Sequence, residues 1–115
     1  DKAYIDFDDT IVVRGKVNLR AIWFLYQCKN ENKQVVLLTK HKDEIAATLE
    51  KCAIPAGLFS SIVHLELSAS KWSAIDPLKA IFIDNAFQER ADVAKRLGIP
   101  VFDVDGIEVL MDWRV

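Results

Sequence analysis

Short apolar runs alternate with segments of helical periodicity along the whole chain. Runs typical of buried β-strands lie at 3–7, 34–39, 61–67, 80–84 and 100–104. Helical spacing is found at 19–30, 42–54 and 87–98, with shorter helices expected within 71–78, ended by Pro77, and at 106–112. Because strands that alternate with helices form parallel sheets, this pattern predicts an α/β fold. We expect a doubly wound, Rossmann-like parallel sheet of about five strands with helices on both faces.

Local signals refine the first half of this picture. Residues 11–17 predict a short hairpin after the first strand, turning at Arg14, Gly15 and Lys16. Asn18 is the expected N-cap of the helix at 19–30.

Three further signals concern the helices. In the helix at 19–30, apolar residues at 19, 22, 23 and 26 predict the buried face, which places Trp23 in the core. The helix at 42–54 has an expected acidic first turn, which suits the helix dipole. Gly98 is expected to end the helix at 87–98.

Size and charge narrow the class of protein. The 115 residues match one domain, spanning 1–115, and 51% of them are hydrophobic, which is ample for a core. The chain opens almost directly into a strand, which we expect of a mature fragment or of a domain excised from a longer protein. The net charge of −2 argues against binding nucleic acid or a membrane through bulk electrostatics. No apolar run approaches the ~20 residues that span a bilayer.

The two cysteines suggest where the protein works. Cys28 and Cys52 both lie in helical patterns, and neither belongs to a CxxC motif or a cluster with histidine. We expect them to be small buried side chains rather than a disulfide or a zinc site. This usage fits a reducing cytoplasm, where we expect the protein to be located.

Polar residues gather where the predicted strands end. Asp6 and Asp8 end the first strand, Thr39 ends the second, and Asp84 and Asn85 end the fourth. In an open parallel sheet these carboxyl ends form the crevice where ligands bind. Clustered carboxylates need a cation, and oxygen ligands in modest number suit Mg²⁺, which prefers to keep waters and to bind phosphate.

These residues also stand in a familiar order. The stretch "DFDDT", 6–10, resembles the DxDxT/V signature of the haloacid dehalogenase (HAD) superfamily. Thr39 after "VVLL" resembles the second motif of that family, and Lys71, opening a short helix, resembles the third. "IFIDN", which holds Asp84, resembles the fourth. The order and spacing match over essentially the whole chain, so the chain is similar to a small HAD-type phosphatase.

The resemblance implies a role for each matched residue. Asp6 would be the nucleophile that takes the phosphoryl group, and Asp8 would be the general acid and base. Asp6, the backbone carbonyl of Asp8, and Asp84 would hold Mg²⁺. Thr39 and Lys71 would orient the phosphate and offset its charge. The acid at position 8 is what HAD phosphatases carry and dehalogenases lack, so phosphate chemistry is favoured.

The fourth motif departs from the usual pattern. Many family members follow its Asp with a second acid, whereas Asp84 is followed by Asn85. Asn85 could hold a metal-bound water, or Glu89 could reach it. Metal affinity is therefore expected to be weaker.

The remaining polar residues around the motifs receive supporting roles. Thr10 is expected to orient Asp6 or Asp8, and Asp9 to support the loop by local hydrogen bonds. Lys40 and His41 follow Thr39 and either touch substrate or form a solvated loop. Lys79 rivals Lys71, but it lies just before a strand, at the wrong end of the sheet.

The sequence thus predicts a Mg²⁺-dependent phosphohydrolase with an aspartyl-phosphate intermediate. A phospho-receiver domain is disfavoured, because the third strand offers no Asp and Lys71 precedes Asp84. A weakly active or inactive HAD-like regulatory or interaction domain is the alternative.

The spacing of the motifs also predicts an open site. The hairpin after the first motif is too short for a cap domain, and the segment from Thr39 to Lys71 is needed by the sheet. The phosphorylated substrate would then be large enough to seal the crevice. Otherwise a neighbouring subunit of a homo-oligomer, or a covalently linked domain, would cover it.

Overall fold

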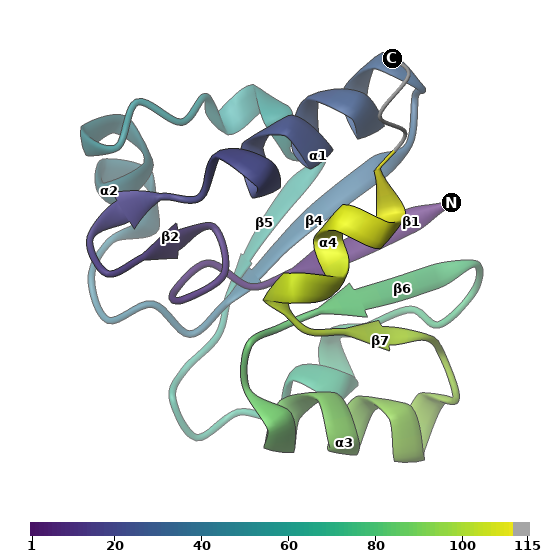
Figure 1. The fold of residues 1–115 in the computed structure, drawn as a ribbon. Coiled ribbons are helices and arrows are strands. Elements are labelled where there is room, and N and C mark those ends of the chain that lie inside the picture. The colour runs from purple at the N-terminus through teal and green to yellow at the C-terminus, as the bar shows by residue number, and fades with distance from the viewer. Residues whose placement is uncertain (112–115) are drawn as a thin grey trace.

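A five-stranded parallel sheet forms the centre of the protein, whose computed structural model describes residues 1–111 (Figure 1). The strand order is β5-β4-β1-β6-β7, and each neighbouring pair is parallel. The strands are β1 (Lys2–Ile5), β4 (Gln34–Thr39), β5 (Ser61–His64), β6 (Ala80–Ile83) and β7 (Val101–Phe102). The predicted α/β class and the five-strand parallel sheet are confirmed, and the arrangement is compatible with a Rossmann-like fold. The strands at 61–67 and 100–104 are shorter than predicted.

Helices lie on both faces of this sheet (Figure 1). The α-helices are α1 (Leu19–Asn30), α2 (Ile45–Lys51), α3 (Phe87–Leu97) and α4 (Ile107–Leu110), and the short 3₁₀ helices are η1 (Ala56–Leu58), η2 (Lys71–Ala74) and η3 (Val104–Gly106). Successive strand residues point to opposite faces. Ile5, Leu37 and Ile83 therefore pack with α1, α2 and α4, while Tyr4 and Phe82 pack with α3. Burial on both faces explains why these strands read as continuous apolar runs.

Helix α1 begins and ends as predicted, but it buries a different face. Its buried residues are Ala21, Phe24, Leu25, Gln27 and Cys28. Leu19 is 77% exposed, Trp23 39% and Tyr26 44%, so the prediction that Trp23 lies in the core was wrong. Of the four predicted positions, Ile22 is partly buried and packs against the core. Residues 21–26 are all apolar, and two helical stripes therefore overlap in this sequence. Packing against the sheet buries the stripe that begins at Ala21 and ends at Cys28, both of which are small residues.

The predicted hairpin and the caps at Asn18 and Gly98 are confirmed, but Lys16, predicted to lie in the turn, begins the second strand of the hairpin. Strands β2 (Val12–Val13) and β3 (Lys16–Val17) pair antiparallel around Arg14 and Gly15, both with positive φ. Two such residues form the tight turn that matches strand twist. The Asn18 side chain accepts a hydrogen bond from the Arg20 amide at 3.2 Å, which caps α1. Gly98 ends α3 in a left-handed conformation, with φ 67°.

Helix α2 is shorter than the predicted helix at 42–54. It begins at Ile45, and Glu44 is its N-cap without a side-chain cap bond. The acidic residues therefore precede the helix, and its first turn holds none. The last predicted helix, 106–112, corresponds to α4, while residue 112 lies outside the described residues.

Cys28 is buried, Cys52 is half-buried, and both are free thiols. Burial raises the pKa of Cys28 to about 11, which keeps the thiol protonated and inert. Within residues 1–111, no helix has the length and apolar character that crossing a membrane requires.

Candidate active site

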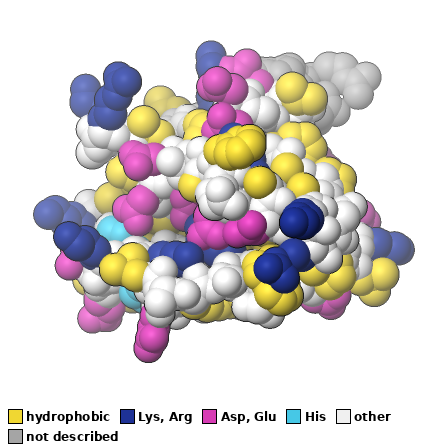
Figure 2. All heavy atoms as spheres, turned by 90° about the horizontal axis from the view of Figure 1, so that it is seen from below, with side chains coloured by type: hydrophobic (Ala, Val, Ile, Leu, Met, Phe, Trp, Pro, Cys, Tyr) yellow, Lys and Arg dark blue, Asp and Glu magenta, His cyan; other side chains and the backbone are white. Residues whose placement is uncertain are grey.

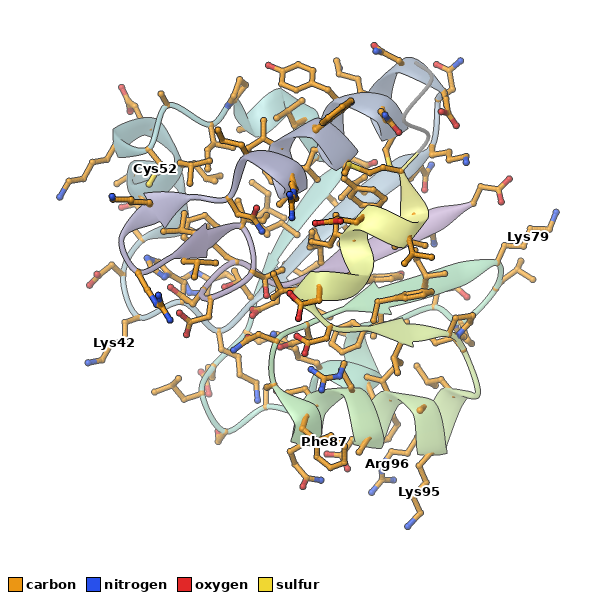
Figure 3. The ribbon with its side chains drawn as sticks, viewed as in Figure 1. Lys42, Cys52, Lys79, Phe87, Lys95 and Arg96 are labelled. Carbon is orange, nitrogen blue, oxygen red and sulfur yellow. The ribbon has the colours of Figure 1, made fainter. Side chains whose placement is uncertain are left out.

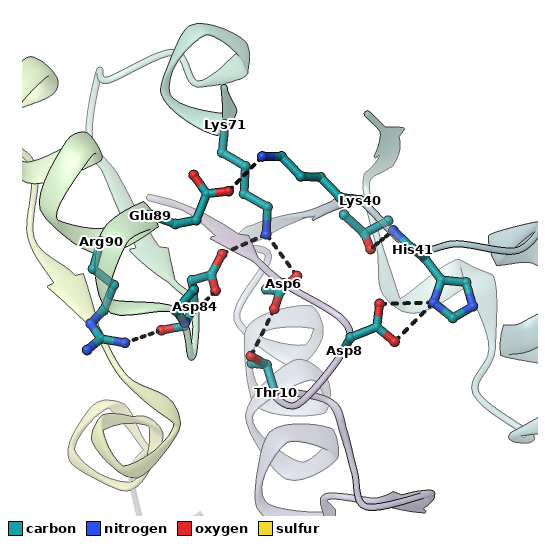
Figure 4. Close-up of polar contacts among 11 residues, drawn as sticks. Asp6, Asp8, Thr10, Lys40, His41, Lys71, Asp84, Glu89 and Arg90 are labelled. Atoms are coloured by element: carbon teal, nitrogen blue, oxygen red, sulfur yellow. Dashed lines mark hydrogen bonds and ion pairs between the residues drawn. The ribbon is translucent and has the colours of Figure 1, made fainter. Parts of the chain in front are cut away.

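Three charged side chains that are far apart in the sequence meet at the carboxyl ends of β1 and β6. Asp6 directly follows β1, and its amide donates to the Ile83 carbonyl at 2.9 Å. Asp84 directly follows β6, the neighbouring strand. The Lys71 ammonium, at the start of η2, donates to Asp6 Oδ1 at 2.8 Å and to Asp84 Oδ2 at 2.6 Å (Figure 4). All three residues are at least 94% buried. The strand order and the buried lysine together fix this cluster.

The charges in this cluster do not balance. Burial raises the pKa of Asp6 to about 6; Lys71 opposes this shift, and the carboxylate of Asp84 adds to it. Burial alone would lower the pKa of Lys71, but the Asp6 and Asp84 carboxylates outweigh burial and hold it above its usual value. Lys71 is therefore the charged partner of two carboxylates. One further positive charge would favour the ionised form of Asp6.

The loop that follows Asp6 holds its carboxylate from the other side. The Thr10 hydroxyl donates to Asp6 Oδ2 at 3.3 Å and is fully buried. The amides of Thr10, Ile11 and Val12 all point to the Phe7 carbonyl, which folds the loop back on itself. Asp9 has φ 60°, a conformation that Asp tolerates better than most residues. Its amide donates to the Val12 carbonyl at 2.7 Å, so its backbone supports the loop.

Asp84 is held by its own local contacts. Its Oδ1 accepts from the Ala86 amide at 2.9 Å, and its backbone carbonyl accepts from Arg90 Nη1 at 2.8 Å. Arg90 lies on α3 and also approaches Asp103 at 3.6 Å. These contacts fix the turn from β6 into α3, and with it the direction of the Asp84 carboxylate.

The Asp8 carboxylate faces a different partner from that of Asp6. Both of its oxygens lie 3.0 Å from His41 Nδ1, and Figure 4 shows the carboxylate directed to His41 rather than to Lys71. His41 Nε2 lies 2.9 Å from the Thr48 hydroxyl. The sequence placed His41 on a loop that either touches substrate or is solvated; the structure joins it to the candidate acid.

Thr39 ends β4, next to β1, and is fully buried. Its Oγ1 accepts from the His41 amide at 3.0 Å. Among residues 1–111, no hydrogen bond joins Thr39 to Asp6 or Lys71, so its expected phosphate contact stays a prediction. A hydroxyl that accepts one bond can still donate another.

The sequence suggested that Lys40 either touches substrate or lies on a solvated loop. It suggested that Glu89 reaches the metal. The structure joins them, with Lys40 Nζ 2.9 Å from Glu89 Oε2 and both side chains about one-fifth exposed. The pair closes one side of the cluster in Figure 4. Asn85, directly after Asp84, is exposed.

The rival lysine lies elsewhere. Figure 3 shows Lys79 at the end of the sheet opposite Lys42, which lies in the loop after β4. The backbone carbonyl of Lys79 accepts from the amide of Lys2, at the beginning of β1. Lys71 and not Lys79 therefore belongs to the carboxylate cluster.

The donor set fits Mg²⁺. Asp6 and Asp84 offer two buried carboxylates, and Mg²⁺ is commonly bound by one or two carboxylates while it keeps several waters. Residues 1–111 hold no group of three or more His, Cys, Asp or Glu side chains placed to bind a metal together. A site built on these residues would therefore need a backbone ligand, and the resemblance assigns this to the Asp8 carbonyl.

The surroundings of the cluster are open and of mixed charge. A groove of about 590 Å³ is lined by Lys40, His41, Lys42, His64 and residues 65–68. Figure 2 shows acidic and basic side chains intermixed over one face, without an extended area of one sign. A second cavity, of about 200 Å³, lies at the amino ends of the strands beside Lys2 and Gln34, away from the carboxylates. Of the candidate site residues, Lys40 and His41 line the groove.

Several contacts in the site were not foreseen from the sequence. Arg90 and Thr48 occupy ordinary helical positions, and His64 is the last residue of β5. His64 Nε2 lies 2.6 Å from the His41 carbonyl. Each of these contacts joins elements that only the fold brings together, so no local sequence pattern predicts it.

Comparisons with known proteins give this geometry no independent assignment. Its interpretation therefore rests on the contacts above and on the motifs in the sequence. No protein-family model matches the chain, and a search of curated proteins finds no match.

Proposed function

We propose that this chain is a Mg²⁺-dependent phosphohydrolase of the HAD type, acting through a phosphorylated Asp6. The observation that carries the proposal is the convergence of the Asp6 and Asp84 carboxylates on buried Lys71 at the ends of adjacent strands. We also propose that the sheet is doubly wound and carries no cap domain. A buried acidic pair with a shared lysine would be costly as a purely structural device.

In the first step, Asp6 would attack the phosphorus of a phosphate monoester. The bond from phosphorus to the leaving oxygen breaks, and this oxygen takes a proton from the Asp8 carboxyl. In the second step, water attacks the phosphorus, and the bond to Asp6 breaks. The proton of this water returns to Asp8, so the net reaction turns ester and water into alcohol and phosphate.

The other residues would bind and orient the phosphoryl group. Lys71 would stay near Asp6 and donate to a phosphate oxygen, and Thr39 would donate its hydroxyl proton. Thr10 holds Asp6 Oδ2, which leaves Oδ1 on the side of Lys71. Asp6, Asp84 and the Asp8 carbonyl would hold Mg²⁺. When bound, this ion supplies positive charge that stabilises the transferring phosphoryl group.

The proposed site would have no cap domain over it. The hairpin β2–β3 has a turn of only Arg14 and Gly15, and the segment between β4 and η2 supplies α2 and β5. Water exclusion strengthens electrostatic catalysis. A large phosphorylated substrate, a neighbouring subunit or a linked domain would therefore complete the site. A substrate screen should include phosphopeptides as well as phosphorylated metabolites.

The second candidate is a weakly active or inactive interaction domain. It is favoured by one observation: Glu89, the acid that could support the metal, is engaged with Lys40. Hydrolysis of p-nitrophenyl phosphate with and without Mg²⁺ separates the two functions. Metal-dependent turnover that exceeds the rate of a protein-free blank supports the hydrolase, and its absence supports the interaction domain.

The Asp8→Asn variant is expected to lose about 10²–10⁴ in kcat on alkyl phosphates, because both proton transfers would lack their carrier. Stability should change little, since the Asp8 side chain is 54% exposed. Steady-state kinetics and thermal unfolding measure the two quantities. An unchanged kcat with an alkyl phosphate would remove Asp8 from the mechanism.

Mg²⁺ affinity is expected to depend on pH through Asp6. Its pKa of about 6 in the metal-free protein means that protons compete with the metal below that pH. The apparent affinity should fall about tenfold per pH unit below ~6 and level off above ~7, because one proton must leave before binding. Calorimetric titration between pH 5 and 8 measures this. Affinity that stays constant over the range would contradict Asp6 as a ligand.

A further inference from the structure

We propose that His41 is a positioning residue that holds the Asp8 carboxylate in place for proton transfer, with Thr48 supporting the imidazole from behind. The inference rests on the proposed function and adds to it a residue that acts through Asp8. It starts from a chain of contacts that joins the loop after β1, the loop after β4 and helix α2.

The contact between Asp8 and His41 is directional. Both carboxylate oxygens lie 3.0 Å from Nδ1, so the Nδ1 hydrogen donates between them. The opposite nitrogen, Nε2, lies 2.9 Å from Thr48 Oγ1. The Thr48 hydroxyl also lies 3.2 Å from the Glu44 carbonyl, one turn earlier. The ring is thereby held through both nitrogens, and its Nδ1 hydrogen is directed to Asp8.

The backbone and the ring face of His41 are fixed as well. Its amide donates to Thr39 Oγ1 at 3.0 Å, and His64 Nε2 lies 2.6 Å from its carbonyl. Its ring meets the Phe7 ring edge to face, with centroids 5.2 Å apart. The His41 side chain is 12% exposed, compared with 54% for Asp8. A half-exposed carboxylate thus contacts a largely buried ring whose two nitrogens both have partners.

The difference in exposure between His41 and Asp8 indicates what the contact between them does. An exposed Asp side chain loses rotamer entropy when it is held for a reaction. A preorganised ring that donates to the carboxylate meets that cost before substrate binds. His41 also lines the open groove of about 590 Å³.

The test compares two leaving groups in the His41→Phe variant, which keeps a flat ring against Phe7 but removes both nitrogens. We expect kcat/KM for an alkyl phosphate to fall about 10- to 100-fold, less than the ~10²–10⁴ of a general acid itself. With p-nitrophenyl phosphate, whose leaving group needs no proton, kcat/KM should fall less than about threefold. An equal fall for both substrates would indicate a merely structural role and overturn the proposal.

Coupling to Asp8 provides the second readout. In the Asp8→Asn background, His41→Phe should have no further effect on the alkyl phosphate, because His41 acts only through that acid. Additive losses would overturn the proposal. If His41→Phe fails to fold, Thr48→Val gives the same comparison with a smaller loss, while Thr48→Ser keeps the hydroxyl and should restore the wild-type ratio of the two substrates.

Nuclear magnetic resonance gives a third readout, which does not depend on enzymatic activity. Long-range ¹H–¹⁵N spectra should show His41 protonated at Nδ1 in the wild-type protein, with its ring signals shifted by Asp8→Asn. A His41 ring unaffected by Asp8→Asn would overturn the proposal. A wild-type chain that lacks turnover overturns the proposed function and this inference with it, whereas an active chain with additive variants overturns the inference alone.

Discussion

The Asp6→Asn variant is expected to lose more than about 10³ in kcat for phosphate-ester hydrolysis. An amide is a poor nucleophile, and removal of a group that forms a covalent intermediate costs at least this much. The fold should persist, because Asn has the same shape and Asp84 still pairs with Lys71. Steady-state kinetics with Mg²⁺ measures the loss, and circular dichroism checks the fold.

Asp9→Asn is the matched control. Asp9 lies in the same loop and is exposed, and its φ of 60° suits Asn equally well. The kcat of the Asp9→Asn variant should stay within about twofold of wild type, the effect usual for a neutral surface change.

Borohydride reduces an acyl phosphate, so wild-type enzyme treated with borohydride during turnover should be modified at Asp6. Near-normal kcat in Asp6→Asn would exclude Asp6 as the nucleophile.

The Lys71→Met variant is expected to lose about 3–5 kcal/mol of unfolding free energy in the metal-free protein. Methionine leaves Asp6 and Asp84 buried without their counter-charge, and breaking a buried ion pair on one side costs this much. Mg²⁺ should restore part of the loss if it binds the same carboxylates. Urea denaturation near pH 7, with and without Mg²⁺, measures both effects.

Lys79→Met is the control for this change. Lys79 is exposed and lies at the opposite end of the sheet, so its replacement should change stability by about 0.5 kcal/mol or less. In the Asp6→Asn background, Lys71→Met should cost less than in wild type, because one buried charge is already gone. Equal losses of unfolding free energy in Lys71→Met and Lys79→Met would show that the cluster of Asp6, Lys71 and Asp84 does not carry buried charge.

The alternation of apolar runs determined most of the fold. It located the strands, the helices and the hairpin turn, because side-chain periodicity and turn chemistry are local properties. The positions of Asp6, Thr39 and Asp84 at the ends of apolar runs also marked them as candidate neighbours. Parallel strands must place their carboxyl ends at one edge, so the sheet class alone brought these residues near one another.

The sequence was ambiguous where two patterns overlapped. Residues 21–26 are apolar without interruption, so periodicity could not decide which side of α1 meets the sheet. Packing against β1 and β4 buried Phe24 and Leu25 and left Trp23 and Tyr26 partly exposed. Acidic residues before α2 were likewise assigned to its first turn, because caps depend on backbone geometry that the pattern alone does not give.

The sequence by itself determined the α/β class, the hairpin turn at Arg14 and Gly15, and the position of the acids at strand ends. Only the tertiary structure decided which polar side chains meet: Lys71 with Asp6 and Asp84, Lys40 with Glu89, and His41 with Asp8. The physical reason is the range of each interaction. Periodicity, capping and turns act within a few residues, whereas these contacts join residues 13 to 65 positions apart. Their approach depends on how the whole sheet is assembled.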